Sequence, residues 1–347
     1  MNVYWCGAED VDFNLVGSGI GSSVAAIPDA AFQRGAAFAA VGTTAWPQVN
    51  YLSNPTSFGN LSTFWFHSWF IIPSSGAGVT LNAMPFIFTD AAGVGRLIIR
   101  TTAATGPLKI STRNAAGTIT DLTLVTNLSP MVQNVAGKID IFVNYSTNGQ
   151  VTIYWNGVVM TDTGPGVNVT TDSATSLSFF YLGSTLTNAA NTYFGEIIVA
   201  DTDTRAARLW ALQSSTAGNV QQWTGAGSNL NKVAINDATY ISSNTVGQIE
   251  EFKLGLALPA GTWQVAALKL SSRALVGSSG PLHLQYVVRT GASPADYTGG
   301  SWAPTGVGTF SSDVQNYMLP NNPATLGPWT TGDLTAVTWN YGIVSAT

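Results

Sequence analysis

Short runs of β-branched and aromatic residues recur along this chain, and turn-forming residues bound each of them. The run Phe64–Ile72 ends at Pro73, and the runs Arg96–Arg100 and Leu108–Thr112 flank the turn-rich segment Ala103–Pro107. Strands of this length with turns between them are typical of β-sandwiches, whereas helices are usually longer and repeat their apolar residues every three to four positions. The pattern predicts an all-β chain.

Residues 138–155 contain the clearest local signal. Apolar residues alternate with others over 139–145, and a second β-rich run, Gln150–Trp155, follows the pair Asn148-Gly149. Asn-Gly favours a tight hairpin turn because both residues tolerate positive φ. We therefore predict an antiparallel hairpin over Lys138–Trp155 that turns at Asn148-Gly149.

Two series of strand-like runs are separated by a stretch of different composition. The first series ends near residue 205 and the second begins near Gln248. Between them, residues 206–212 suit a short helix, and 213–247 are dense in Ser, Thr, Asn and Gly, as in a connection that runs over a surface. The sequence predicts two jelly-roll-like β-sandwich domains, residues 1–205 and the smaller 248–347, joined by a linker over 206–247.

The charge content excludes several classes of protein. Only 9% of residues are charged, against about 25% in an ordinary soluble domain. The 13 basic residues are scattered, which argues against nucleic-acid binding. The single cysteine, Cys6, rules out an internal disulfide framework and suits a buried position. The opening residues lack a secretory signal pattern, and no apolar run approaches the roughly 18 residues of a membrane helix, so we expect no membrane insertion.

The acidic residues do not match a glycosidase. Such enzymes use two carboxylates about 5–9.5 Å apart. Glu250 and Glu251 are adjacent and therefore point to opposite faces of a strand, as do Glu196 and Asp201, five positions apart. His67 lies within an aromatic run and suits a structural role. We expect no enzymatic activity.

Two sets of residues are candidates for binding. Asp201 and Asp203 form a D-x-D pair at a strand end, where two carboxylates can contribute to a calcium site; alternatively, they belong to a turn and pair with Arg205. No other cofactor is expected. Four tryptophans in polar or Pro/Gly-rich loops are either sugar-stacking platforms or anchors of their loops: Trp46, Trp223, Trp302 and Trp329.

As a set, several segments resemble a family of virion proteins of tailed bacteriophages. The opening Tyr4–Phe13 is similar to the family's W-x-G-G-E-D-I-D-F start, with Ala8 in place of the second glycine. The other similar segments are Leu61–Trp69, Gly195–Arg205, Gln222–Gly225, Asn236–Ala238, Asn322–Thr325 and Trp329-Thr330. The resemblance covers nearly the whole chain. It implies a concanavalin A-like (laminin-G-like) first domain and a structural or adhesive role without a catalytic site.

The resemblance also implies a place of action. The chain would be made in the host cytoplasm and reside on the virion surface, as a head or tail decoration, spike or fibre component in contact with capsid or tail proteins. The low charge favours contact with copies of itself, and we expect a homotrimer. Two alternatives stay open: an adhesin that recognises host surface glycans, and a secreted polysaccharide-degrading enzyme.

Overall fold

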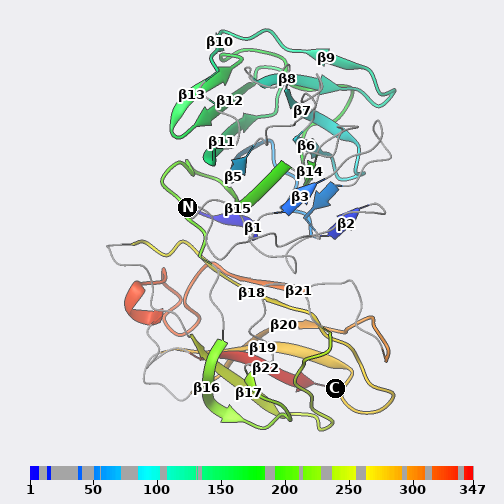
Figure 1. The fold of residues 1–347 in the computed structure, drawn as a ribbon, viewed down its shortest axis with the longest axis vertical. Helices are drawn as coiled ribbons and strands as arrows, with labels where there is room; N and C mark the ends of the chain where they lie inside the picture. The colour runs from blue at the N-terminus through cyan, green and yellow to red at the C-terminus, as the bar shows by residue number, and fades with distance from the viewer. Residues whose placement is uncertain are drawn as a thin grey trace. The chain divides into compact units, whose positions relative to one another are not determined.

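The structure is a computed structural model in which the chain forms two compact units, residues 3–210 and 211–347 (Figure 1). It describes residues 1–7, 14–16, 38–40, 51–54, 56–71, 85–101, 108–129, 131, 135–183, 192–210, 214–227, 237–254, 263–290, 295–308, 315–334 and 340–346. All strand pairs among these residues are antiparallel, and the predicted all-β class is confirmed. No helix in the described part of the chain is long and apolar enough to cross a membrane.

Two antiparallel sheets form the first unit. The order of the eight-stranded sheet is β1 (Val3–Gly7), β15 (Thr192–Ala200), β5 (Thr63–Ile71), β11 (Gly137–Asn144), β12 (Gln150–Trp155), β13 (Val158–Asp162) and β10 (Thr126–Asn127), with β3 (Phe38–Ala40) also paired to β15. The order of the seven-stranded sheet is β2 (Asn14–Val16), β4 (Tyr51–Ser53), β14 (Phe179–Gly183), β6 (Phe86–Thr89), β7 (Gly95–Thr101), β8 (Leu108–Arg113) and β9 (Ile119–Asp121).

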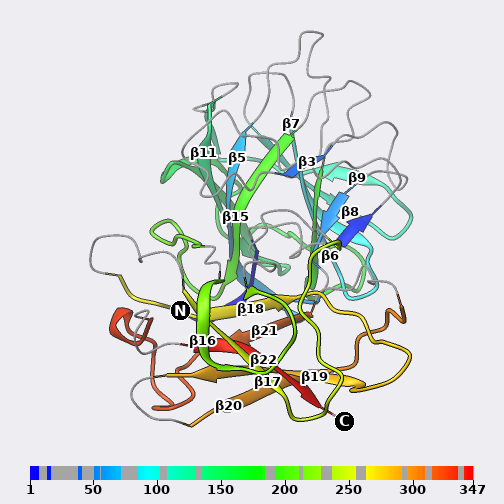
Figure 2. The ribbon, with the colours of Figure 1, turned by 60° about the horizontal axis from the view of Figure 1, so that its bottom comes forward.

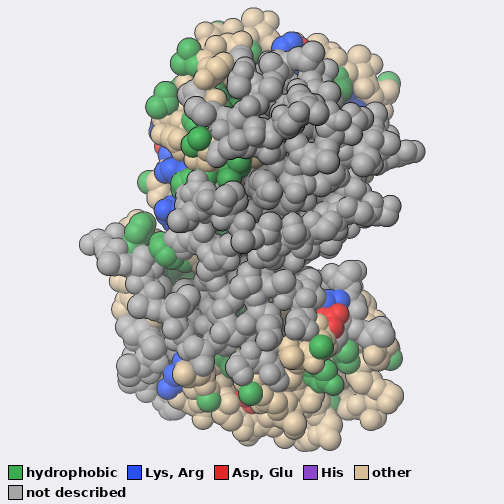
Figure 3. Space-filling view, viewed as in Figure 1, with side chains coloured by type: hydrophobic (Ala, Val, Ile, Leu, Met, Phe, Trp, Pro, Cys, Tyr) green, Lys and Arg blue, Asp and Glu red, His purple; other side chains and the backbone are tan. Residues whose placement is uncertain are grey.

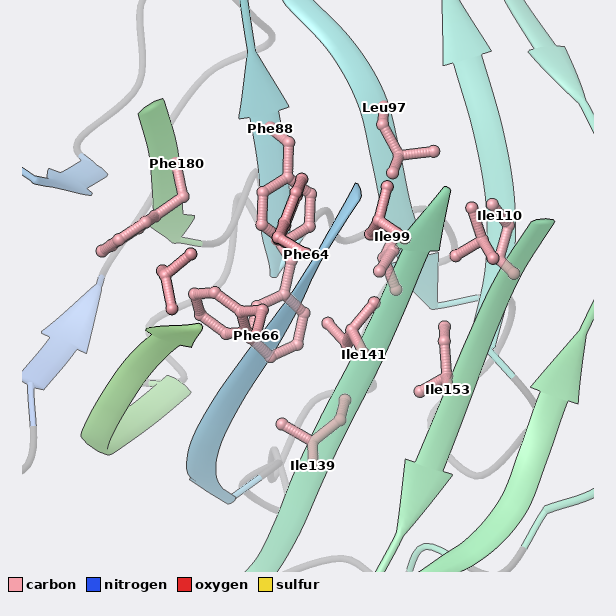
Figure 4. Close-up of a cluster of buried hydrophobic side chains, with 14 of the residues drawn as sticks. Phe64, Phe66, Phe88, Leu97, Ile99, Ile110, Ile139, Ile141, Ile153 and Phe180 are labelled. Carbon is pink, nitrogen blue, oxygen red and sulfur yellow. The ribbon is translucent and has the colours of Figure 1, made fainter. Parts of the chain in front are cut away.

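A dense aromatic and aliphatic core connects these two sheets (Figure 4). Phe66 of β5 meets Phe88 of β6 edge to face, with ring centroids 5.4 Å apart, and Ile141 and Ile153 extend the core from β11 and β12. Fully burying a side chain of this size stabilises the fold by about 1.5–3 kcal/mol. Because side chains alternate along a strand, the residues between these core positions lie on the outer face of the eight-stranded sheet.

The predicted hairpin is confirmed, but its turn differs from the expectation. β11 pairs with β12 from Ile139–Trp155 to Asn144–Gln150. Gly149 does not have a left-handed φ; a Cβ there would lie 2.2 Å from the carbonyl oxygen of Asn144, so close approach of the backbone explains the glycine. The tight Asn-Gly turn is the next one, where Asn156 (φ 50°) and Gly157 (φ 82°) connect β12 to β13.

The second unit is a smaller sandwich. Its five-stranded sheet has the order β16 (Ser214–Gln221), β17 (Ile249–Leu254), β22 (Asn340–Ala346), β19 (His283–Arg289) and β20 (Tyr297–Trp302), while β18 (Leu268–Ser272) pairs with β21 (Gln315–Leu319) (Figure 2). Tyr286 of β19 stacks on Tyr317 of β21 at 5.7 Å, which joins the two sheets. A 3₁₀ helix, η4 (Thr331–Leu334), adds Leu334 to the core.

The stretch expected to be a linker, residues 206–247, contains a strand. β16 pairs with β17, although the pairing shifts between Ala217 and Gln221. At this bulge, two adjacent glutamates of β17 replace the missing ladder bonds: Glu251 Oε2 accepts from the backbone N–H groups of 219 and 220, and Glu250 Oε2 from those of 222 and 223. Charge-assisted bonds of this kind are stronger than neutral ones, and they hold a strand of small polar residues that has little apolar surface to bury.

The short helix expected over 206–212 is absent from the described part of that segment. Residues 205–206 form a turn and 207–210 are irregular. The side chains of Arg205 and Arg208 are instead held against the outer face of the eight-stranded sheet, as described below. These tertiary contacts outweigh the weak helix propensity of a short segment.

Candidate functional site

The described tryptophans of the predicted set are anchored in the fold and do not form a common binding face. Trp223 and Trp329 lie in loops as expected, whereas Trp302 is the last residue of strand β20. Trp302 and Trp329 are 8% and 2% exposed, and Trp329 Nε1 donates to the carbonyl oxygen of Leu319 at 2.8 Å. Trp223 is half-buried and donates to the carbonyl oxygen of Gln248 at 3.0 Å. Trp46 lies outside the described residues. Burial of these rings leaves little of their faces for a sugar.

The D-x-D pair follows the end of β15, where Asp203 belongs to a turn. The carboxylate of Asp203 accepts from the backbone N–H of Arg205 at 2.9 Å and from its Nε at 2.9 and 3.0 Å. These hydrogen bonds lower the pKa of Asp203. The geometry matches the alternative in which Asp203 belongs to a turn, since its carboxylate already pairs with the guanidinium group of Arg205. In the described part of the chain, no three His, Cys, Asp or Glu side chains gather into a group suited to a metal ion.

The outer face of the eight-stranded sheet contains an aromatic row that the sequence analysis did not identify. By strand register, Trp65 of β5 is next to Phe142 of β11, Phe142 is next to Thr152 of β12, and Thr152 is next to Asp162 of β13. The ring centroids of Trp65 and Phe142 are 5.3 Å apart, and both side chains are half-buried. We call these four residues the platform row. It changes from aromatic to polar across four neighbouring strands.

Hydrogen bonds fix the polar end of the platform row. Asp162 Oδ1 accepts from Thr152 Oγ1 at 2.9 Å, from Gln150 Nε2 at 3.1 Å and from the backbone N–H of Gly164 at 2.9 Å. All three donors converge on the same oxygen. No described residue donates to the other oxygen, Oδ2, and Asp162 is half-buried rather than enclosed. The carboxylate is therefore rigidly held while one acceptor remains open to a ligand.

A second row runs parallel to the first, and two of its three residues are fully buried. His67 of β5 is next to Asp140 of β11, and Asp140 is next to Tyr154 of β12. His67 Nδ1 lies 2.7 Å from Asp140 Oδ1, which also accepts from Thr204 Oγ1 at 2.8 Å. His67, Asp140 and Thr204 are fully buried although they lie on the outer face.

Residues 201–210, which we call the strap, contact this face next to the platform row. The guanidinium carbon of Arg205 lies 4.6 Å from the Tyr154 ring centroid and 5.7 Å from that of Trp65, as in cation–π contacts. Lys138 Nζ donates to the carbonyl oxygen of Arg205 at 3.0 Å. The strap therefore positions a guanidinium group at the edge of the aromatic platform.

A bulge in β15 fastens the end of the strap. Glu196, at φ 48°, lies where the pairing with β5 shifts, and its buried carboxylate accepts from Arg208 Nε at 2.9 Å and Nη2 at 3.0 Å. Left-handed backbone is unfavourable for a residue other than glycine, and such strain persists where other contacts compensate it. Arg208 also lies over the ring of Trp69 at 5.5 Å.

The charges around the platform are mostly negative. Burial raises the pKa of Tyr154, the positive charge of Arg205 lowers it, and the carboxylates of Asp203, Asp162 and Asp140 raise it further. Arg205 is in turn paired with Asp203. A ligand on the platform therefore meets carboxylate acceptors beside a guanidinium group that already bonds a carboxylate.

One signal in the sequence could have revealed this face. In the alternation of the hairpin, Phe142 occupies an outward position between Asp140 and Asn144, where a polar residue is expected. A large aromatic residue at such a position is informative because it leaves apolar surface outside the core. Like Phe142 on β11, Trp65 occupies an outward position on β5. It lies two strands away from Tyr154.

Comparisons with known proteins yield remote structural similarities only. The sequence matches no protein family and no curated protein. Similar solved structures include an endo-β-1,4-glucuronan lyase from the fungus Trichoderma reesei (12% identity, 55% of this chain, 90% of that chain, TM-score 0.40) and a carbohydrate binding module from Bacillus subtilis (10%, 46%, 91%, 0.32). The receptor binding domain of botulinum neurotoxin type G matches over 100% of this chain and 98% of its own (9% identity, TM-score 0.37).

Proposed function

We propose that this chain is a carbohydrate-binding protein and that the sugar binds on the platform row. The observation that carries the proposal is the change along this row from two half-buried aromatic rings to a hydroxyl and a carboxylate. A pyranose ring has the same division, because its C–H face is apolar and its edge carries hydroxyls. Stacking on Trp65 and Phe142 would place the edge of the ring toward the half-buried Asp162, which the buried hydroxyl of Thr152 holds in place.

We propose binding without cleavage of the sugar. Glycosidic cleavage by the usual route needs an acid and a base or nucleophile that both reach the bond. Of the carboxylates near the platform, Asp140 is fully buried beneath the strap and bonded to His67 and Thr204, and Asp203 is paired with Arg205. Asp162 is the remaining carboxylate near the row, and it suits a hydrogen bond to a hydroxyl.

Affinity electrophoresis through gels that contain polysaccharides tests the proposal. Phe142→Ala and Trp65→Ala each remove one stacking surface, which we expect to weaken retardation about tenfold, from roughly 1.5 kcal/mol of aromatic contact. The matched control is Trp263→Ala, which removes an exposed ring in the second unit. Circular dichroism checks that each variant is folded. Equal retardation of the Phe142 and Trp263 variants by every glycan that binds the wild type would refute the proposed site.

We also propose that the chain acts as a structural component of a bacteriophage virion, where glycan binding would serve attachment to the host. The low charge supports this role, and charged side chains form only small scattered patches on the described surface seen in Figure 3. A surface with so little charge has weak long-range repulsion between copies. We expect a homotrimer of the 36.3 kDa chain.

Two measurements test the virion role. Multi-angle light scattering at micromolar concentration should give three times the chain mass, and labelled antibodies should decorate the head or tail surface of purified particles. A stable monomer that is also absent from the particles would contradict this proposal while leaving the glycan site untouched.

A further inference from the structure

We infer that the ligand of the platform row is a neutral glycan rather than an acidic one. The inference rests on the proposed carbohydrate binding and concerns the chemical class of the sugar. It follows from which polar atoms next to the platform remain open and which are already bonded.

The open atom is an acceptor. The three donors that fix Asp162 all reach Oδ1, which leaves Oδ2 available. The carboxylate is already oriented, so a sugar hydroxyl can donate to Oδ2 without further ordering of the protein. A carboxylate acceptor favours hydroxyl donors and repels the carboxylate, sulfate or phosphate groups of acidic glycans.

The cations near the platform are already engaged. The guanidinium group of Arg205 is bonded to Asp203 and packed on Tyr154, and Lys138 Nζ donates to the carbonyl oxygen of Arg205. Arg208 forms a two-bond fork with the buried carboxylate of Glu196. An anionic group is usually recognised by a guanidinium fork or an ammonium group that is free to face it. Here each fork faces a carboxylate of the same chain.

The Asp203–Arg205 pair adds a second polar edge to the site. Their side chains are 43% and 41% exposed while they bond each other, so the pair presents both an acceptor and a donor to solvent beside the aromatic rings. Neutral sugars offer neighbouring hydroxyls that can donate to one group and accept from the other. The aromatic rings of the platform row therefore have polar groups that complement hydroxyls on two sides: Asp162 at the far end of the row, and the Asp203–Arg205 pair beside Trp65.

The experiment compares glycan classes and a nearly isosteric variant. Retardation is measured in gels that contain neutral mannan or dextran, and in gels that contain alginate or dextran sulfate, at low and at physiological salt. We expect the wild type to bind a neutral polysaccharide more tightly than either acidic one. Asp162→Asn keeps the shape of the side chain and one acceptor oxygen but places an amide donor at the Oδ2 position, so neutral binding should fall about tenfold.

The control and the contrary outcomes separate the two proposals. Asp237→Asn, which changes an exposed carboxylate of the second unit, should leave retardation unchanged. If acidic glycans bind more tightly than neutral ones, and Phe142→Ala weakens that binding, the site stands and the neutral class is wrong. Unchanged neutral binding by Asp162→Asn would also overturn the inference. If no glycan of either class retards the wild type, the proposed carbohydrate binding itself fails.

Discussion

Nδ1 of His67 lies 2.7 Å from Oδ1 of Asp140, and both side chains are fully buried on the outer face of the eight-stranded sheet. The same carboxylate oxygen accepts the hydroxyl of Thr204 in the strap. One buried oxygen therefore connects β5, β11 and the strap. Because burial of such groups is costly unless they are bonded, this arrangement attaches the strap at a defined position.

Removing the carboxylate should destabilise the first unit strongly. Asp140→Ala leaves His67 and Thr204 buried without their shared acceptor, and we expect a loss of about 3–5 kcal/mol in the free energy of unfolding. Thr204→Val removes only the bond from the strap and should cost about 1 kcal/mol. Urea denaturation compares the two variants. Equal losses would show that the carboxylate acts only through Thr204.

The ion cluster on the outer face of the seven-stranded sheet should make stability depend on acid pH. Partial burial acts to raise the pKa of Asp121, but hydrogen bonds from Lys109, Ser111 and Arg100 outweigh it and bring the pKa to about 2, below the ordinary 3.8. Because the pKa of Asp121 is lower in the folded state, its ionised carboxylate stabilises the fold above pH 4. This stabilisation is lost as pH falls toward 2.

The comparison with Asp121→Asn isolates this contribution. The wild type should be more stable than the variant at pH 7, by about 1 kcal/mol or less because the pair is partly exposed to solvent. The difference should vanish below pH 2. A difference that persists at that pH would show that the bonds do not depend on the charge.

Glu251 should respond to pH in the opposite direction. Burial raises its pKa above the ordinary 4.5, and the charge of Arg289, whose Nε lies 3.2 Å from Oε1, works against this rise. A raised carboxyl pKa means that the folded state binds the proton more tightly. The contribution of the protonated Glu251 carboxyl group to stability is complete below pH 4.5, and it is lost as pH rises through the pKa of the folded state.

Two substitutions separate the charge of Glu251 from its hydrogen bonds. Glu251→Gln keeps an acceptor for the backbone N–H groups of 219 and 220, so we expect a change below about 1 kcal/mol at pH 7. Glu251→Ala leaves both groups unpaired and should cost about 2–4 kcal/mol. Denaturation between pH 4 and 8 should also show the wild type gaining stability relative to the Gln variant as pH falls.

Gly137 and Gly157 of the first unit should both resist substitution by alanine, but for different physical reasons. A Cβ at Gly137 would lie 2.1 Å from Cζ2 of Trp155, whereas one at Gly157 would meet nothing within 4 Å but would adopt φ 82°. Gly137→Ala should cost about 1–3 kcal/mol through overpacking and change the fluorescence of Trp155. Gly157→Ala should cost about 1 kcal/mol through backbone strain and leave that fluorescence unchanged.

The sequence predicted the strands where one periodicity dominates. Alternation over residues 139–145 was enough to identify the β11–β12 hairpin, because every second residue enters the core. It did not identify β16, whose residues are small and polar and whose position depends on Glu250 and Glu251 far along the chain. The side-chain bonds that hold this strand have no counterpart in a local pattern.

The sequence pattern did not predict the platform row, for a related reason. Aromatic residues occupy both faces of β5, with Phe64 and Phe66 in the core and Trp65 on the outer face, so the run shows no contrast between inside and outside. Polar neighbours in the sequence suggested an exposed ring at Trp302 and Trp329, yet the fold buries both side chains, and Trp302 belongs to β20. Which aromatic residue faces a ligand depends on strand register and on the strap, and neither can be read from neighbouring residues.

The fork between Arg208 and Glu196 has a mechanical consequence. The chain leaves the first unit just after Arg208, and the second unit begins at residue 211. Tension that enters the first unit along the chain from residue 211 therefore reaches this two-bond fork, which passes it to β15 through Glu196, before it reaches Thr204. A pull on the second unit would load the fork first, and the platform row would keep its shape until the fork gives way.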